Sequence, residues 1–507
     1  MGFAGPTSHD LLTGAQRLGL PLSGRDAATM VAALANAAES MRRLDAMPDP
    51  GMELADTTPR PAGRAPLPAE NRYGAWAWLG PLEGTGSGIL AGKSVAVKDN
   101  IAVRAWPLRN GSAVFDGYVP QSDATVVTRI LQAGGSIRGK TVCENLSFSG
   151  SSHTSWPHRV LNPYDTTRAA GGSSSGSGVV IATGEVPMAL GCDQGGSIRI
   201  PAAWCGAVGL KPTHGLVPYT GICALEASID HCGPMGATVE DTARLLTAIA
   251  GPDRLDPRQP VGLVCDDYMA ALSGGLHGLR IAVMREGFAR PESDAGSDSA
   301  VREALARMRA AGAVVEEISN PAHGEMFDLW NAICLEGTAT ALFGASTGSF
   351  AEGHASLDLL EAFAQGWRAR PEAVSPTALM GLLMGDYANR VYHGRFFAKA
   401  QALRARVRDA YTRAFAGYDL LAMPTIPFPA SALPPDGASL TEMLEVALPM
   451  IANTAPLNAS GHPAITVPCA LRAGLPIGLM LVGRHFDDAT VLRGAAGLEA
   501  TADWRAC

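Results

Sequence analysis

From residue 88 onward, short runs rich in β-branched residues alternate with longer segments of helical periodicity, and this alternation limits the possible fold most strongly. β-Branched runs favour strands, and strands separated by helices are typical of α/β folds. We expect strands at Ser94–Lys98, Arg280–Met284, Val314–Ile318, Asp419–Met423, Ala464–Pro468 and Ile477–Val482. Helices are expected near residues 123–134, 298–312 and 396–415. The sequence therefore predicts an α/β protein.

Residues 1–47 are predicted to form a separate helical unit. A short helix is expected around residues 9–18, and a capping-box spacing at Ser23–Asp26 begins a second over residues 24–46. Apolar residues recur on one face of this second helix: Val31, Leu34, Ala38 and Met41. The next segment, residues 48–87, is rich in proline, which cannot continue a helix or lie inside a sheet. It is therefore predicted to be an extended linker or wrapping segment.

Composition excludes several classes of protein. The net charge is −8, and no stretch supplies the basic patch that nucleic-acid binding requires. No apolar run approaches the ~18 residues of a membrane span, and the first residues lack the pattern of a signal peptide. The 9 cysteines are scattered without a Cys-x-x-Cys pair, which is typical of reduced core residues. We expect a cytoplasmic protein that binds neither nucleic acid nor a membrane.

The run Ala170–Gly178 consists almost entirely of glycine and serine. Alone, it could be a flexible linker. Gly172–Gly176 also has the Gly-x-Ser-x-Gly pattern of a nucleophile elbow, but that motif requires a preceding strand and residues 162–167 are turn-like. The apolar run Val179–Ala182 that follows indicates burial, which a linker does not need. A buried loop is therefore favoured.

The segment Gly191–Ala202 places two glycines directly before Ser197. Glycine leaves backbone N–H groups unshielded, and such groups can point together at an oxyanion that develops during acyl transfer. Pro201 suits the first turn of a helix, whose N-terminus would add a favourable dipole. Alone, this segment could also be only a tight turn that enters a helix.

Lys98 ends the apolar strand expected at Ser94–Lys98. The tripeptide Gly92–Ser94 invites a P-loop interpretation, but that motif needs glycine where this chain has Ser87. Lys98 and Asp99 point to opposite faces of a strand, so Lys98 is not simply paired with its neighbour. A lysine at a strand end is ordinarily exposed, whereas a desolvated lysine can act as a general base.

Taken together and in their order along the chain, these segments resemble the amidase signature family. The pattern of that family is a strand-end lysine, a Gly/Ser-rich loop and Gly-Gly-Ser-[Ile/Val]-Arg-x-Pro-Ala. The spacing from Ser173 to Ser197 matches that family. The resemblance extends over about residues 88–500 and includes Gly209–Thr213, Met423–Thr425 and Gly461–Ala464. The parts most similar to bacterial amidases that act downstream of nitrile hydratase are the helical N-terminus, Asp193–Gln194 and Met450–Pro456.

The resemblance implies a large mixed β-sheet covered by helices, with the catalytic domain over residues 88–507. It implies a cofactor-free serine amidohydrolase that cleaves a small-molecule amide to a carboxylate and ammonia through an acyl-enzyme on Ser197. Ser173 would be a bridging serine beside a cis peptide, and Lys98 would be the base. A serine hydroxyl needs a base to take its proton, and a second hydroxyl can relay that proton. The resembling amidases also suggest a homodimer with the helical N-terminal unit at the contact.

The remaining site residues follow from the same resemblance. The N–H groups of the oxyanion hole would belong to Gln194, Gly195, Gly196 and Ser197. The nucleophile loop would be braced by Asp193 and Arg199. An apolar acyl pocket would be formed by Phe148, Trp330 and Ile451, each of which could equally be an ordinary core residue. Some branches of the family have Thr or Ile in place of Gln194, which concerns the side-chain environment of the oxyanion hole but not its backbone donors.

Other chemistries have weaker support. No His-Glu-x-x-His motif is present, so no metal site is expected. The histidines that stand out are expected to be solvated loop residues, His153 and His158, or structural, His462. A cysteine hydrolase that uses Cys143 with Lys140 and Glu144 is disfavoured, because adjacent residues of a strand face opposite sides.

Three other functions stay open at this point. One is the catalytic subunit of a tRNA-dependent amidotransferase, which needs partner chains. Another is a hydrolase that prefers anilides, carbamates or esters. The third is an inactive binding or scaffold protein, because a fold does not fix a function. The three filled catalytic positions and the helical N-terminal unit favour the amidase.

Overall fold

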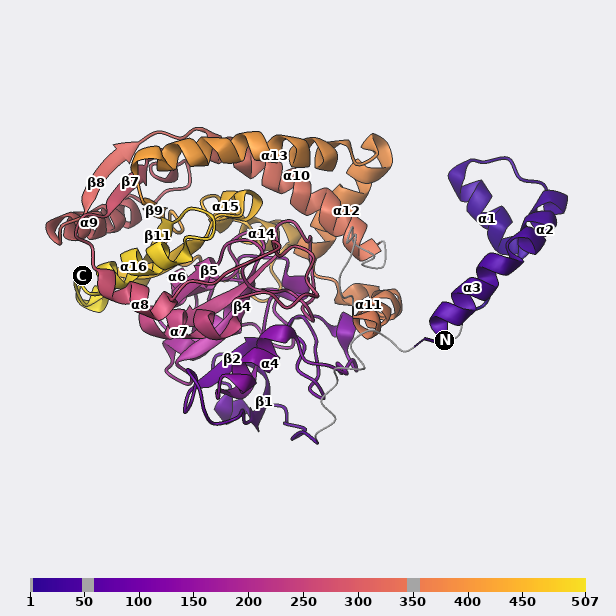
Figure 1. The fold of residues 1–507 in the computed structure, drawn as a ribbon, viewed down its shortest axis with the longest axis horizontal. Helices are drawn as coiled ribbons and strands as arrows, with labels where there is room; N and C mark the ends of the chain where they lie inside the picture. Colours follow the sequence, from indigo (N-terminus) through magenta and orange to yellow (C-terminus); the bar gives the residue numbers. More distant parts are fainter. Residues whose placement is uncertain (1–2, 48–58, 344–355) are drawn as a thin grey trace. The chain divides into compact units, whose positions relative to one another are not determined.

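The computed structural model describes residues 3–47, 59–343 and 356–507, and the chain divides into two compact units, Met1–Ala55 and Asp56–Cys507. The first unit contains helices α1 (Ser8–Leu18), α2 (Gly24–Ala33) and α3 (Ala35–Asp45) (Figure 1). Within the described ranges, no helix is both long enough and apolar enough to span a membrane.

The predicted helix over residues 24–46 is two helices in the structure. Ser23 is the N-cap, as expected, and its hydroxyl accepts a hydrogen bond from the N–H of Asp26 at 3.1 Å. The helix is interrupted at Leu34, whose ψ of −2° departs from the helical value of about −42°. The prediction of one continuous helix was therefore wrong.

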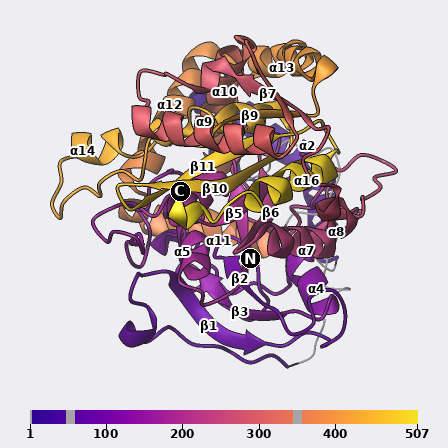
Figure 2. The same ribbon diagram turned by 90° about the vertical axis from the view of Figure 1, so that its left-hand side faces the viewer.

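The second unit is built on one mixed sheet of 11 strands in the order β1-β3-β2-β4-β6-β5-β10-β11-β9-β7-β8. The strands are β1 (Trp76–Leu82), β2 (Ser94–Lys98), β3 (Ser136–Thr141), β4 (Met188–Asp193), β5 (Val208–Lys211), β6 (His231–Gly236), β7 (Arg280–Met284), β8 (Val314–Ile318), β9 (Leu420–Pro424), β10 (Ala464–Arg472) and β11 (Leu475–Val482). Figure 2 follows this order from β1 at the bottom to β7 at the top. All six predicted strands are present.

Parallel pairs occur in two parts of the sheet and antiparallel pairs lie between them. β2 pairs in parallel with β3 and β4, and β7 with β8 and β9. Between these parts, five successive pairs are antiparallel: β4–β6, β6–β5, β5–β10, β10–β11 and β11–β9. β2 and β4 thus end side by side, which brings Lys98 and the loop after Asp193 to one edge of the sheet.

The segment 48–87 differs from its prediction. Residues 48–58 lie outside the described residues, but β1 lies within the segment and pairs antiparallel with β3. The second unit therefore includes much of the segment that was predicted to be a linker. Pro81 is tolerated because β1 is the outermost strand of the sheet and its pairing with β3 is irregular between Leu79 and Leu82.

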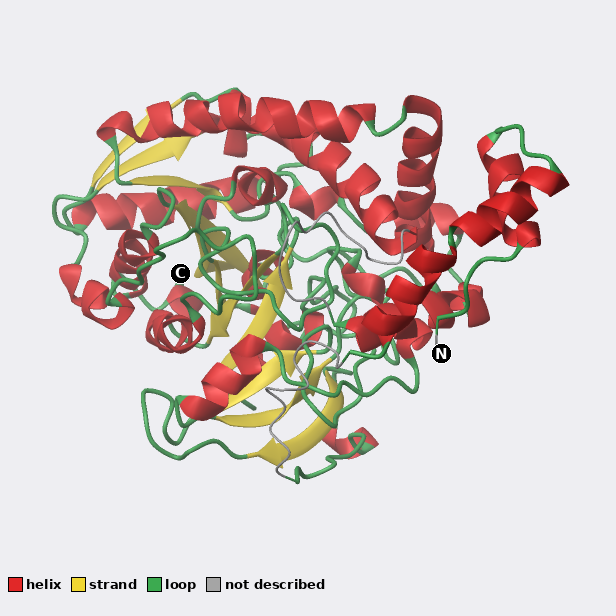
Figure 3. Ribbon diagram, turned by 45° about the vertical axis from the view of Figure 1, so that its right-hand side comes forward, coloured by secondary structure: helices red, strands yellow, loops and turns green. Residues whose placement is uncertain are grey.

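Helices lie on either side of the strands (Figure 3). They are α4 (Thr125–Gln132), α5 (Ser175–Ala182), α6 (Arg199–Cys205), α7 (Val239–Ile249), α8 (Tyr268–Ala271), α9 (Ala295–Ala310), α10 (Ala322–Phe343), α11 (Leu357–Ala369), α12 (Pro376–Tyr392), α13 (Arg395–Ala414), α14 (Leu440–Glu445), α15 (Ala455–Ser460) and α16 (Asp488–Glu499). The three helices predicted in this unit correspond to α4, α9 and α13. The fold is the expected α/β architecture of a large mixed sheet covered by helices.

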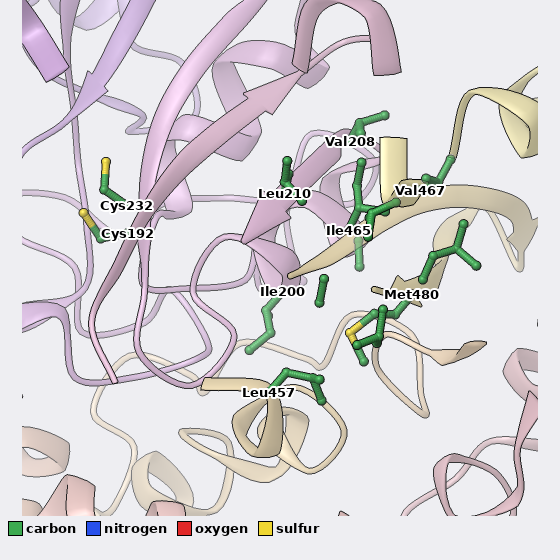
Figure 4. Close-up of a cluster of buried hydrophobic side chains, with 14 of the residues drawn as sticks. Cys192, Ile200, Val208, Leu210, Cys232, Leu457, Ile465, Val467 and Met480 are labelled. Atoms are coloured by element: carbon green, nitrogen blue, oxygen red, sulfur yellow. The ribbon is translucent and has the colours of Figure 1, made fainter. Parts of the chain in front are cut away.

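An apolar cluster supports the region around α6. Its buried side chains come from α6, α15 and several central strands, and those labelled in Figure 4 include Ile200, Val208, Leu210, Leu457, Ile465, Val467 and Met480. Burial of each large aliphatic side chain contributes about 1.5–3 kcal/mol. This cluster gives the loop between β4 and α6 a rigid base.

Candidate active site

Ser197 lies in the short loop that joins β4 to α6. The strand ends at Asp193, and the helix begins at Arg199 with Pro201 in its first turn, as the sequence predicted. Ser197 is 7% exposed, and its carbonyl accepts a hydrogen bond from the N–H of Ser174 at 3.2 Å. This bond joins the loop to the Gly/Ser-rich segment, which is buried and leads into α5 rather than forming a linker.

Lys98 and Ser173 form a hydrogen bond inside the protein. The lysine is fully buried at the end of β2, and its Nζ donates to Ser173 Oγ at 2.7 Å. The peptide bond between Gly172 and Ser173 is cis, as the resemblance implies. Asp99 forms an ion pair with Lys140 at 2.8 Å instead of with Lys98. The structure thus brings Lys98, Ser173 and the Ser197 loop together.

A buried ion pair holds the two ends of the loop between β4 and α6. Arg199 donates to both carboxylate oxygens of Asp193, through Nε at 3.0 Å and Nη2 at 2.9 Å. Burial raises the pKa of Asp193, but the charge and the hydrogen bonds of Arg199 outweigh this effect and lower it to about 2. The carboxylate therefore stays charged at neutral pH. The contact between Asp193 and Arg199 that the resemblance implies is therefore present.

Asn458 of α15 completes this network. Its side chain donates to the backbone carbonyl of Asp193 at 2.8 Å and to the carboxylate at 2.9 Å, and it accepts from Arg199 at 2.7 Å. The sequence analysis did not identify Asn458. It lies far along the chain in a segment without a polar pattern, so no sequence signal distinguished it from other asparagines.

The N–H groups of the loop between β4 and α6 are not equivalent. The N–H of Gly196 donates to Asp193 Oδ1 at 2.7 Å, so the expectation that it serves the oxyanion hole does not fit this geometry. The N–H groups of Gly195 and Ser197 have no hydrogen-bond acceptor among the described residues. Gly196 has φ of +137°, and a Cβ there would lie 2.3 Å from Thr454 Oγ1, so the position requires glycine.

The Gln194 side chain has a defined partner that the sequence analysis missed. Its Nε2 donates to the hydroxyl of Tyr219 at 2.8 Å, and that hydroxyl donates to the carbonyl of Cys223 at 3.3 Å. Burial and the nearby Cys192 thiol raise the pKa of Tyr219 well above its usual value, so the phenol stays neutral. The side-chain amide of Gln194 is therefore held in one position by Tyr219.

A cavity of about 170 Å³ opens beside Ser197. The three predicted acyl-pocket residues, Phe148, Trp330 and Ile451, all line it together with Gln194, Gly195 and Ser197. Further lining residues are mostly apolar, and none of the described lining residues is charged: Ser147, Ser149, Gly150, Leu225, Phe327, Asn331, Cys334, Leu335 and Leu448. The cavity can therefore receive an apolar group next to the serine.

The cysteine and histidines considered for other chemistries lie in environments that do not favour those roles. Burial raises the pKa of the Cys143 thiol to about 12, which keeps it protonated and unreactive at neutral pH. His153 is buried rather than solvated, contrary to its prediction, because the serine-rich loop that carries it is itself buried. His158 is exposed, as expected. His462 is buried, and the centroid of its ring lies 3.9 Å from that of His485. In the described parts of the chain, no group of three potential metal ligands is found.

Comparisons with known proteins place this site in context. The family model described as "Amidase" matches residues 70–492. An enantioselective amidase of Rhodococcus rhodochrous is 45% identical over 87% of this chain and 86% of its own length. One glutamyl-tRNA(Gln) amidotransferase subunit, from Methanosarcina acetivorans, is 37% identical over 82% of this chain and 86% of its own length. The crystal structure of a bacterial aryl acylamidase of the amidase signature family matches with a TM-score of 0.70 at 25% identity, over 82% of this chain and 84% of its own.

Proposed function

The chain belongs to the amidase signature family and is an amidase, and from this premise we propose that its reaction runs through Ser197, Ser173 and Lys98. The observation that carries the proposal is the buried hydrogen bond of 2.7 Å between Lys98 Nζ and Ser173 Oγ, beside the loop that holds Ser197. Histidine, the base of many serine hydrolases, is not required by this arrangement.

The proposed first half of the reaction forms an acyl-enzyme. The neutral Lys98 amine takes a proton from Ser173 as Ser173 takes the proton of Ser197, and Ser197 Oγ attacks the amide carbonyl carbon. The negative charge that develops on the carbonyl oxygen is stabilised by backbone N–H groups of the loop. The proton returns through Ser173 to the amide nitrogen, the C–N bond breaks, and ammonia leaves.

The second half restores the enzyme. Water loses a proton to the same relay and attacks the acyl carbon, the bond to Ser197 Oγ breaks, and Ser197 regains a proton. The products are a carboxylate and ammonia, and no cofactor takes part in the proposed scheme. Only an unprotonated amine can accept the proton in this scheme.

The cavity supports amides with an apolar acyl group about the size of one ring. Its volume of about 170 Å³ is similar to the ~150 Å³ apolar cavity that accommodates benzene in another protein. An amino-acid amide such as glutamine would bring an ammonium and a carboxylate, for which the described lining offers no charged partner. This observation favours the amidase over a component of an amidotransferase. Anilides and esters of similar acyl groups stay possible substrates.

The proposal extends to the assembly and the compartment. We expect a cytoplasmic enzyme that acts as a homodimer, with the helical unit of residues 3–47 at the contact. Large apolar side chains of this unit are exposed, and association would cover them: Leu18, Leu20, Met30, Leu34, Met41, Leu44 and Met47.

Replacement of Ser197 by alanine tests the proposed function. The Ser197→Ala variant should lose roughly 10⁴-fold or more in kcat for ammonia release by the purified chain alone. An electrophilic inhibitor should label Ser197 in the natural protein and leave Ser173 free. Recovery of the adduct on Cys143 or Ser174 would contradict the assignment of the nucleophile.

A further inference from the structure

Three successive carbonyl groups of the nucleophile loop are each held by a hydrogen-bond donor. The carbonyl of Gln194 accepts from Trp330 Nε1 at 2.6 Å, and that of Gly195 accepts from Thr454 Oγ1 at 2.6 Å. The carbonyl of Gly196 accepts from the N–H of Ile200, in the first turn of α6, at 2.7 Å. Two of these donors are therefore side chains from distant parts of the chain.

These bonds determine where the loop's N–H groups point. Among the described residues, only the peptides Trp156–Pro157 and Gly172–Ser173 are cis, so the peptides of the loop are trans. In a trans peptide the C=O and N–H groups point in opposite directions across a rigid plane. We call the side-chain hydrogen bonds to the carbonyls of Gln194 and Gly195 tethers. The tether from Trp330 to the Gln194 carbonyl therefore directs the N–H of Gly195 away from the indole nitrogen.

The next peptide is held at both ends. Thr454 holds its carbonyl, which belongs to Gly195, and Asp193 accepts from its N–H, which belongs to Gly196, at 2.7 Å. With the neighbouring planes held through the carbonyls of Gln194 and Gly196, rotation of all three peptides is restricted, which limits the movement of the N–H groups of Gly195 and Ser197.

We propose that Trp330 and Thr454 are positioning residues that aim the N–H groups of Gly195 and Ser197 at the developing oxyanion. This inference rests on the proposed function, because it takes Ser197 as the nucleophile. Neither side chain needs to bond to the reacting atoms. Oxyanion stabilisation depends on donors that are already oriented when charge develops, so the loss of a tether should act on the transition state.

Close packing shows that the tethers leave the loop little freedom. A Cβ at Gly195 would lie 2.7 Å from Trp330 Cζ2, and one at Gly196 would lie 2.3 Å from Thr454 Oγ1. Thr454 is fully buried, and it is not among the residues that line the cavity. Its hydroxyl bonds to the carbonyl of Gly195 at 2.6 Å and has a longer contact of 3.2 Å with the carbonyl of Ile451, so its main effect on catalysis should pass through the loop. Trp330, in contrast, also borders the space for the acyl group.

The sharpest test compares two substitutions of Thr454. Thr454→Val keeps the branched shape and removes the donor, whereas Thr454→Ser keeps the hydroxyl. We expect Thr454→Val to lower kcat by about 10–100-fold with KM changed less than about threefold, and Thr454→Ser to retain most of the activity, given that one lost oxyanion donor costs about 10²–10³-fold. The pH dependence of kcat/KM should stay unchanged, because the proton relay is intact.

A second pair of variants tests the indole tether independently. Trp330→Phe removes the N–H and should lower kcat at least tenfold, with an added change in KM because the cavity is reshaped. Trp78→Phe is the matched control: Trp78 Nε1 donates to the carbonyl of Ala62 at 3.0 Å, away from the loop, so its loss should leave kcat unchanged.

The outcomes separate this inference from the proposed function. Natural kcat in both Thr454→Val and Trp330→Phe, with an inactive Ser197→Ala enzyme, would overturn the tethers and leave the nucleophile in place. Equal damage in Thr454→Ser and Thr454→Val would also overturn the role of the hydroxyl, because packing alone would then explain the loss. An active Ser197→Ala enzyme would instead refute the proposed function.

Discussion

The two sides of Ser197 are built from opposite kinds of residue. Beneath it, the charged and polar groups of Asp193, Arg199 and Asn458 are fully buried and bonded to one another. Beside it, the cavity wall is apolar and mostly makes van der Waals contacts. Hydrogen bonds fix direction and fail when one partner is lost, whereas apolar contacts change gradually with shape. The polar side is therefore suited to chemistry and the apolar side to substrate choice.

The largest effect should come from the base on the polar side. Lys98→Arg should lower kcat/KM roughly 10²–10⁴-fold, nearly as much as Lys98→Ala, because guanidinium keeps its charge and cannot accept a proton from Ser173. Because the proposed reaction needs an unprotonated base, kcat/KM of the natural enzyme should rise with pH along the acid limb of its profile. Measured pH–rate profiles check both statements.

The control for the base is a histidine. His153→Gln should keep the acid limb of the pH profile, because His153 has no place in the proposed relay. An active Lys98→Arg enzyme, or an acid limb that disappears with one histidine, would refute the Ser–Ser–Lys mechanism.

The next largest effect concerns stability of the polar side. Asp193→Asn leaves the buried Arg199 without its counterion, which should lower the free energy of unfolding by about 3–5 kcal/mol, as measured by urea denaturation. Because the pKa of Asp193 is lowered to about 2, its stabilisation is present above pH ~4 and is lost as pH falls toward 2. The variant should lack this loss.

A surface ion pair is the matched control for this measurement. Arg472 and Glu303 form a partly exposed pair at 2.7 Å, and Glu303→Gln should change the unfolding free energy by less than about 1 kcal/mol. Equal effects of Asp193→Asn and Glu303→Gln would show that the buried network contributes no more than an exposed pair.

Changes on the apolar side should be smaller and should depend on the substrate. Ile451→Val removes one methylene from the cavity wall, which should shift the preference between small and ring-sized acyl groups by about 1 kcal/mol, largely through KM. A panel of aliphatic, aromatic and 2-aryl amides measures this shift. A uniform loss of kcat across the panel would place Ile451 with the catalytic groups instead.

A change outside both regions should leave the chemistry unaltered. Removal of residues 1–47 should leave kcat per folded chain unchanged, because this segment supplies none of the proposed catalytic groups. We expect monomers, because the apolar side chains of the unit are no longer available for association, or aggregation, because the surface that they cover becomes exposed. Light scattering distinguishes the two outcomes. A truncated protein that stays fully dimeric would show that the interface lies elsewhere.

Prediction from the sequence worked best where the signal was local. Strands rich in β-branched residues were found, whereas β4 and β6 were missed because their sequences, Met188–Asp193 and His231–Gly236, are rich in glycine, cysteine and methionine. β1 was missed because prolines surround it. These three strands form because they pair with neighbouring strands, which their own residues do not indicate.

The same distinction applies to the candidate site. Lys98, Ser173 and the Gly195–Ser197 segment lie in compact motifs, so their proximity could be expected from resemblance. Thr454 and Asn458 are single polar residues more than 250 positions from the loop groups that they contact. Only the folded chain distinguishes them from other buried threonines and asparagines.

The shared position of Trp330 limits how this enzyme can be redesigned. Its ring borders the substrate space, while its nitrogen holds the Gln194 carbonyl. Libraries that enlarge the cavity at Phe148 or Ile451 leave the side-chain donors to the loop carbonyls in place. Libraries at Trp330 exchange selectivity for rate in a single step, so directed evolution of this scaffold should keep that codon fixed until a second donor to the loop has been introduced.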